Sequence, residues 1–298
     1  MNRNQPASVA PWHQTNWDWR AALNFICGGT GTGLLVAAAL FGGAAYGWLA
    51  LVALALVAFG LFWVWMEIGK PWRSINVFFN PQTSWMTRES IVAGPLFLAA
   101  LAAAWTGSGW LAAIAALVAV GFLYCQGRIL EASKGIPAWR EPAIIPLVIA
   151  TGLAEGMGLA TAVLAASGSL AGRAPLVVLI VLLVAREVAW RRYRAALVRA
   201  GAPKGTLAVL RRIELPFTLA GNWAPAVLLL AALPAHDAAN AFAVVAGLAA
   251  LAAGWFAKFT IVARAAFNQG FALPALPIRG TGVRTEGTKP GWEKPARG

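Results

Sequence analysis

The chain has 298 residues, of which 59% are hydrophobic and only 12% are charged, and its formal net charge is +13. Soluble globular domains have about 45–50% apolar and about 25% charged residues, so this composition excludes an ordinary soluble domain and also intrinsic disorder. In a membrane protein the first explanation of a positive charge is its distribution over the loops, and we therefore expect no nucleic-acid partner.

Residues 1–19 form a polar, tryptophan-bearing leader with neither a short apolar core nor a small-residue cleavage site, so we expect no removable signal peptide. Residues 20–266 contain continuously apolar runs of about 20 residues, the length that crosses a bilayer as a helix. The sequence therefore predicts an all-α integral membrane protein with eight transmembrane helices in two four-helix halves. The expected spans are 20–42, 48–69, 89–106, 109–131, 143–166, 174–198, 215–233 and 238–266.

The connections between these spans alternate between short turns and long basic loops. Of the 24 Lys and Arg residues, only Arg173 lies in one of the four short turns. The positive-inside rule then places the long loops and both termini in the cytoplasm, with the helices in a bacterial inner membrane. The tail, residues 267–298, is rich in Pro, Gly and charge and is expected to be extended.

Few side chains in the expected spans suit redox or metal chemistry. A haem inside the membrane normally needs histidine ligands, but neither His13 nor His236 lies within a span. Cys27 and Cys125 lie singly in apolar runs without a CxxC pair, which argues against a disulfide framework, a zinc site or an iron–sulfur cluster in this chain. We expect no haem and no metal here.

Glu155 is the clearest ionisable residue at bilayer depth, with Asn24, Asn222 and Lys258 as weaker candidates for ion or proton transport. Because a lone acid makes a poor proton relay, we favour a protonated carboxyl that is hydrogen-bonded between closely packed helices. Lys258 lies near the end of its span and is expected to extend its ammonium towards the interface. The small residues beside the acid are Gly152, Gly156 and Gly158.

The segment 67–90, EIGKPWRSINVFFNPQTSWMTRES, is the densest polar stretch near the cytoplasmic interface. Ser84 or Thr87 is a suitable N-cap for the following helix, with Glu89 in its favoured first turn. A capped helix with interfacial tryptophans explains much of this segment. A quinone pocket explains it further, because aromatic faces, donors to the carbonyl oxygens and a proton-exchanging carboxylate are what a quinone requires.

This segment resembles the connection between the second and third helices in the membrane-anchor subunits of dimethyl sulfoxide reductase-type molybdenum enzymes, the NrfD-like and polysulfide-reductase anchor group. The family pattern is an ionisable residue, Gly-x-Pro-x-Arg, an Asn-x-x-(Thr)-Ser stretch and a polar-Glu pair. The segment GRILEASKGIPAWREP is similar to the family's Pro-x-Trp stretch in a later loop. The matching positions are Glu67, Gly69 to Arg73, Asn80 to Ser84 and Arg88-Glu89.

The resemblance implies a role for each matching residue. The family's acid at the start of the third helix handles quinol and corresponds to Glu89. The ionisable residue that closes the second helix is often a histidine in the family, and Glu67 departs from that pattern, although a carboxylate also passes protons. Around these two acids, the residues expected to bind ubiquinone or menaquinone are Arg73, Trp85, Trp72, Ser84, Arg88 and Asn24.

The resemblance also implies partners. Such anchors bind an iron–sulfur subunit, which binds a molybdopterin catalytic subunit; both are expected on the cytoplasmic face, as in quinone-linked sulfite dehydrogenases and phenylacetyl-CoA acceptor oxidoreductases. The basic stretch 186–212 is expected to contact such a partner or anionic lipid headgroups. A transporter or channel and a purely structural anchor are the alternatives. The arginines expected to dock the partner are Arg191, Arg192, Arg194 and Arg140.

Overall fold

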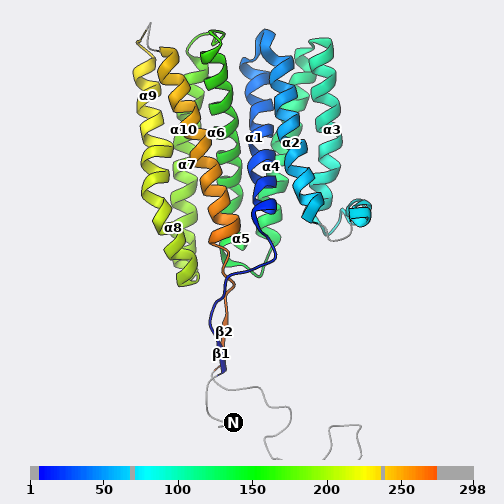
Figure 1. Cartoon of the computed structure of the whole chain (residues 1–298), viewed down its shortest axis with the longest axis vertical. Coiled ribbons are helices and arrows are strands. Elements are labelled where there is room, and N and C mark those ends of the chain that lie inside the picture. The colour runs from blue at the N-terminus through cyan, green and yellow to red at the C-terminus, as the bar shows by residue number, and fades with distance from the viewer. Residues whose placement is uncertain (1–6, 68–70, 236–238, 274–298) are drawn as a thin grey trace, which may run out of the picture. The chain divides into compact units, whose positions relative to one another are not determined.

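The computed structural model describes residues 7–67, 71–235 and 239–273. These residues are mostly helical, in agreement with the predicted all-α fold (Figure 1). Gly43–Ala45 (η1) and Pro71–Phe78 (η2) are 3₁₀ helices, while Phe217–Trp223 (η3) and Thr260–Arg264 (η4) are π-helical. The α-helices are α1 (Trp19–Phe41), α2 (Tyr46–Glu67), α3 (Trp85–Thr106), α4 (Gly109–Ala132), α5 (Pro137–Arg140), α6 (Ile144–Ala166), α7 (Ala174–Arg199), α8 (Lys204–Pro216), α9 (Ala224–Ala232) and α10 (Ala239–Phe259).

Within the described residues, 7 helical segments are long and apolar enough to cross a membrane, as in a multi-pass membrane protein. α8, η3 and α9 join into one such segment, Lys204–Ala232, and α10 continues into η4. The remaining long helix, α7, has 26 residues, but Arg186, Glu187 and Arg191 interrupt its apolar character. Seven segments therefore meet the criterion, against the eight spans expected.

One predicted boundary is wrong by about a dozen residues. The helix expected to begin at residue 215 begins at Lys204. Its charged residues lower the mean hydropathy of residues 204–214, so this part does not read as an apolar run. α8 is nevertheless amphipathic and buries Thr206, Leu210 and Ile213 on one face. This segment therefore extends beyond the apolar span.

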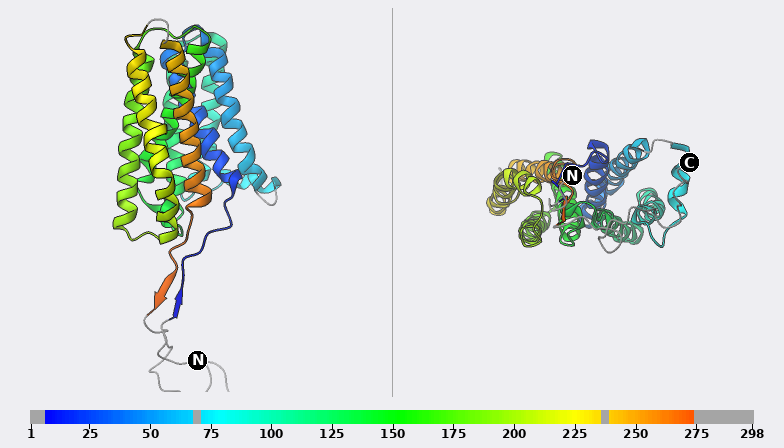
Figure 2. Two further views of the ribbon diagram at one scale, coloured as in Figure 1. Left: turned by 60° about the vertical axis from the view of Figure 1, so that its left-hand side comes forward. Right: turned by 90° about the horizontal axis from the view of Figure 1, so that it is seen from below.

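Two helices lie at the centre of the helical unit. In α1 and α6, 78% and 72% of the residues in the most apolar window are buried, against 28–39% in the other membrane-length segments. Seen along the helix axes, α2, α3 and α4 lie on one side of this pair and α7, α9 and α10 on the other (Figure 2). η2, the α4–α6 connection and the α7–α8 connection lie at one end, called here the loop-rich end, and the α1–α2, α3–α4 and α6–α7 turns lie at the other, called the short-turn end (Figure 1).

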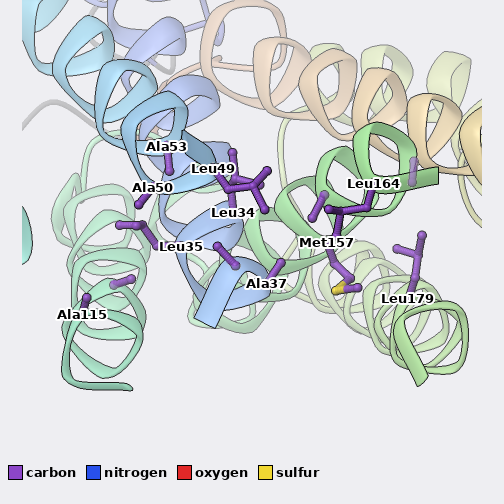
Figure 3. Close-up of a cluster of buried hydrophobic side chains, with 14 of the residues drawn as sticks. Leu34, Leu35, Ala37, Leu49, Ala50, Ala53, Ala115, Met157, Leu164 and Leu179 are labelled. Carbon is purple, nitrogen blue, oxygen red and sulfur yellow. The ribbon is translucent and has the colours of Figure 1, made fainter. Parts of the chain in front are cut away.

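Small residues allow the central helices to approach closely. A Cβ atom added to Gly156 would lie 2.0 Å from the carbonyl carbon of Gly33, and one added to Gly247 would lie 2.3 Å from the carbonyl oxygen of Gly158. These contacts join α1 to α6 and α6 to α10 through backbone packing, as is common between membrane helices. Near the short-turn end, Leu35, Leu49, Met157 and further apolar side chains fill the core (Figure 3).

The helical unit comprises residues 12–269, wider than the expected 20–266. The backbone N–H of Gln14 donates to the carbonyl of Ala266 at 2.9 Å, and the ring of Trp17 stacks on Trp139. Asp18 caps α1, and its hydrogen bond with the Arg20 side chain lowers the pKa of the Asp18 carboxyl. Part of the predicted leader therefore belongs to the helical unit.

The second unit contains a two-stranded antiparallel ribbon, in which β1 (Ala7–Val9) pairs with β2 (Phe271–Leu273) and Ser8 lies opposite Ala272. The sequence predicted an extended tail but not this pairing. Most of that tail, residues 274–298, lies outside the described residues, as do residues 1–6, His236 and the Gly69-Lys70 pair of the loop motif.

Candidate functional site

Glu89 lies deeper than its sequence position suggested. Ser84 is the N-cap of α3, and its side chain accepts a hydrogen bond from the backbone N–H of Thr87 at 3.2 Å. The helix starts at Trp85, so Glu89 falls in the second turn, about 6 Å along the axis, and the first turn contains no acid. The expectation that Glu89 occupies the first turn at the surface is therefore wrong, because Ser84 rather than Thr87 caps the helix.

Three helices enclose the Glu89 carboxylate, which is 3% exposed. From α1, the side-chain amide of Asn24 donates to Glu89 Oε1 at 3.4 Å. From α4, the amide of Gln126 donates to the carbonyl oxygen of Asn24 at 3.0 Å. The structure therefore brings together Glu89 and Asn24, and adds Gln126.

This cluster has a surplus of hydrogen-bond acceptors. Asn24 Oδ1 and Gln126 Oε1 are buried and have no donor among the described residues. Buried polar atoms are nearly always paired, and an unpaired one calls for an explanation such as a bound water, an ion or a catalytic role. A hydroxyl group is a hydrogen-bond donor. A buried carboxylate beside two unpaired acceptor oxygens is therefore chemically suited to a small molecule that carries hydroxyl groups.

Trp85, one turn before Glu89 on α3, is surrounded by two arginines and a tyrosine. The guanidinium of Arg88 lies 4.0 Å from the Trp85 ring centroid, and that of Arg128 lies 4.6 Å from it. Tyr124 meets the same ring edge-on. Arg88 also donates through Nε to the carbonyl oxygen of Pro81 at 2.7 Å, which fixes the preceding loop against α3. Trp85 and Arg88 lie on α3, the helix that carries Glu89.

Three other predicted residues lie apart from this cluster. Trp72 is 92% exposed on η2, and Arg73 is exposed beside it. Glu67 ends α2 nearer to Asp18 and Arg20, with its Oε1 lacking a donor among the described residues. The described contacts do not bring any of the three to Glu89. The described contacts therefore join Glu89 to Asn24 but not to Trp72, Arg73 or Glu67.

Gln126, Arg128 and Tyr124 were missed in the sequence. They lie near the end of the fourth expected span, where polar residues are ordinarily assigned to the interface. The spacing of Tyr124 and Arg128, four residues apart on one helical face, is the signal that was available.

Two surface cavities, of about 520 and 440 Å³, lie along α7 and α8 rather than beside Glu89. Arg191 lines both cavities and pairs with Glu187 at 2.6 Å, while Arg194 lines the smaller one and pairs with Glu214 at 3.0 Å. The other two predicted docking residues are Arg192, which is exposed on α7, and Arg140, which donates to the carbonyl oxygen of Lys134 at 3.1 Å.

A second buried polar cluster lies between α1, α6 and α10. The ammonium of Lys258 contacts Glu155 Oε2 at 2.7 Å, and the hydroxyl of Thr30 donates to the same oxygen at 2.8 Å. Glu155 is therefore not a lone acid. Lys258, 4% exposed, does not extend to the interface as expected, because Glu155 and the carbonyl oxygen of Phe25 hold it inside the bundle.

Arg186 is fully buried on α7, and its Nη2 donates to the backbone carbonyl oxygen of Gly221 in η3. Its Nε donates to Asn222 Oδ1 at 2.7 Å, and its Nη1 donates to the carbonyl oxygen of Ala250 at 2.8 Å. Asn222 in turn donates to Glu187 Oε2 at 2.8 Å. The Arg186 guanidinium is thus hydrogen-bonded within the bundle, and Asn222 links it to Glu187.

No protein-family model matches the chain, and no curated protein matches it. The function proposed for the chain therefore depends on the chemistry of these clusters and on the motif in residues 67–90.

Proposed function

We propose that this chain is the haem-free, quinone-reactive membrane anchor of a molybdopterin and iron–sulfur oxidoreductase. The observation that carries the proposal is the buried Glu89 carboxylate beside Asn24 and Gln126, whose side-chain oxygens lack donors. Conversion between quinone and quinol moves two protons, so a titratable group must stand beside the quinone oxygens. Glu89 supplies that group, and the amides of Asn24 and Gln126 orient the hydroxyls.

Electrons would pass between this site and an iron–sulfur partner subunit at the loop-rich end, which in turn binds the molybdopterin subunit. Two features at that end favour it as the docking face: the basic residues, Arg140 among them, and the exposed η2 segment. Catalysis at molybdenum and electron transfer through the iron–sulfur clusters belong to the partner subunits. This chain contributes the reaction with quinone.

We also propose that α7 crosses the membrane, which makes eight spans in two four-helix halves. The charges that interrupt α7 support rather than oppose this, because Arg186 is hydrogen-bonded inside the bundle. With an even number of spans and the basic residues at the loop-rich end, the positive-inside rule predicts that both termini lie in the cytoplasm of a bacterial inner membrane.

The test is Glu89→Gln in the assembled complex. The amide keeps the size of the side chain but removes its titratable proton, so quinone-linked turnover should fall at least about 100-fold. Turnover with an artificial dye at the catalytic subunit should stay unchanged, which shows that the complex is assembled. The matched control is Glu141→Gln, at the same end of the unit, which should leave both rates unchanged. Quinone-linked turnover near the unmodified rate in Glu89→Gln would contradict the proposal.

Proton or ion transfer across the bundle is a second candidate, favoured by the buried Glu155–Lys258 pair. Charged residues at bilayer depth commonly mark ion or proton routes. In proteoliposomes that contain the unmodified complex, turnover should then acidify or alkalinise the lumen, and Glu155→Gln should abolish this pH change. If quinone-linked turnover proceeds without any pH change, the pair is structural.

A further inference from the structure

A groove at the loop-rich end combines positive charge with apolar walls. The larger cavity is lined by Trp190, Arg191, Arg211 and Leu215, among others, and the smaller one adjoins it and is lined by Arg194 and Arg199. Two carboxylates, Glu187 and Glu214, also line the groove, against four arginines, so it keeps a net positive charge.

The groove lies at headgroup depth. Arg191 is 17 residues from the short-turn end of α7, and Arg211 is 21 residues from that end of the joined α8–α9 segment. At about 1.5 Å per residue, these positions lie about 26 and 32 Å from the short-turn end. The hydrocarbon core of a bilayer is about 30 Å thick. With the short-turn ends of the helices at one face of the hydrocarbon core, the groove lies at the opposite face, next to the phospholipid headgroups.

Three donor atoms on residues that line the groove lack an acceptor among the described residues. Arg194 contacts Glu214 through Nη2, but its Nε and Nη1 are buried and have no acceptor among the described residues. The indole N–H of Trp190 is also buried without an acceptor in the described part of the chain. An unmet buried donor is costly, and a phosphate supplies several acceptor oxygens at once.

Apolar side chains continue from the groove towards the short-turn end. Leu215 and Leu219 are 66% and 50% exposed, and Val188 on α7 is 42% exposed. They offer acyl chains a surface directly beside the arginines. A soluble anion such as inorganic phosphate has no apolar part that could contact this surface.

We propose that the α7–α8 groove binds the headgroup phosphate of an anionic glycerophospholipid, with Arg191, Arg194 and Arg211 as its cationic contacts. The site is separate from the quinone cluster on α1, α3 and α4 and does not depend on the proposed function. It assigns Arg191 and Arg194 to lipid rather than to a partner subunit.

The test uses the purified full chain, delipidated in detergent and titrated with phosphatidylglycerol while bound lipid is counted by native mass spectrometry. The variant is Arg191→Gln/Arg194→Gln. The matched control is Arg192→Gln/Arg212→Gln, which removes the same charge from neighbouring exposed residues that do not line the groove. Phosphatidylcholine and inorganic phosphate are the comparison ligands.

Each removed contact should weaken binding about fivefold, so the groove variant should bind phosphatidylglycerol more than about tenfold more weakly than the control variant. Equal losses in both variants, or equal binding of inorganic phosphate or phosphatidylcholine, would overturn the proposal. So would a groove variant that binds lipid normally but fails to assemble with partner proteins. Should the groove variant not fold, Arg211→Gln against Arg212→Gln provides the same comparison.

Discussion

Lys258 and Glu155 form an ion pair 2.7 Å apart in the interior of the helical unit, although they are 103 residues apart in the chain. The pair joins α10 to α6, and Thr30 and Phe25 connect it to α1. A Cβ atom added to Gly254 would lie 2.3 Å from Glu155 Oε1, and one added to Gly29 would lie 2.1 Å from Lys258 Nζ. Glycines on both sides thus make room for the pair.

We predict that Lys258→Met lowers the thermal stability of the detergent-solubilised protein substantially. Removing one partner of a buried ion pair costs about 3–5 kcal/mol, because the other charge stays buried without compensation. The double variant Lys258→Met/Glu155→Gln should recover much of the loss, since it removes both charges. Lys204→Met, at an exposed position, is the control and should change the melting temperature little. A Lys258→Met protein with the same melting temperature as the unmodified chain would show that the pair contributes no stability.

The crossing of α1 and α6 gives a second prediction. Gly156→Ala would place a Cβ within 2.0 Å of Gly33, so the helices must separate or shift. Overpacking of this kind costs about 1–3 kcal/mol, and the melting temperature should fall. Gly121→Ala in α4 is the matched control, because nothing lies within 4 Å of its added Cβ. If the two variants have the same melting temperature, α1 and α6 do not approach as closely as described here.

The orientation gives a third prediction. Reporter domains fused after Pro203 and at the carboxyl end should both report the cytoplasm, because the basic residues gather at the loop-rich end. A fusion in the short turn near Ser169 should report the opposite side and serves as the control. A periplasmic signal from either of the first two fusions would exclude a cytoplasmic partner subunit.

The sequence predicted the helices well because apolar runs of membrane length have few alternative folds. It placed the start of the segment 204–232 late, because charge on one face of an amphipathic helix lowers the average hydropathy. It placed Glu89 a turn too shallow, because Ser84 and Thr87 both suit an N-cap and one sequence cannot choose between them.

The polar contacts inside the unit were harder to predict for a physical reason. Lys258 lies 103 residues from Glu155, and Gln126 lies 102 residues from Asn24, so their partners depend on which helix faces pack together. Without a packing arrangement, each is assigned the usual behaviour of its residue type, which for Lys258 near a helix end is extension to the interface. In the structure, the packing of α10 against α1 and α6 instead places Lys258 beside Glu155 and the carbonyl oxygen of Phe25.

The most direct test of the central claim is purification of the affinity-tagged chain from the membranes of the organism that makes it, with iron, molybdenum and quinone assayed in the eluate. The account predicts that iron and molybdenum co-elute with the chain in a constant ratio, that quinone is extracted with it, and that no haem absorbance follows the chain. A chain that elutes without iron or molybdenum, or with haem in constant ratio, would contradict the assignment as a haem-free quinone-reactive anchor.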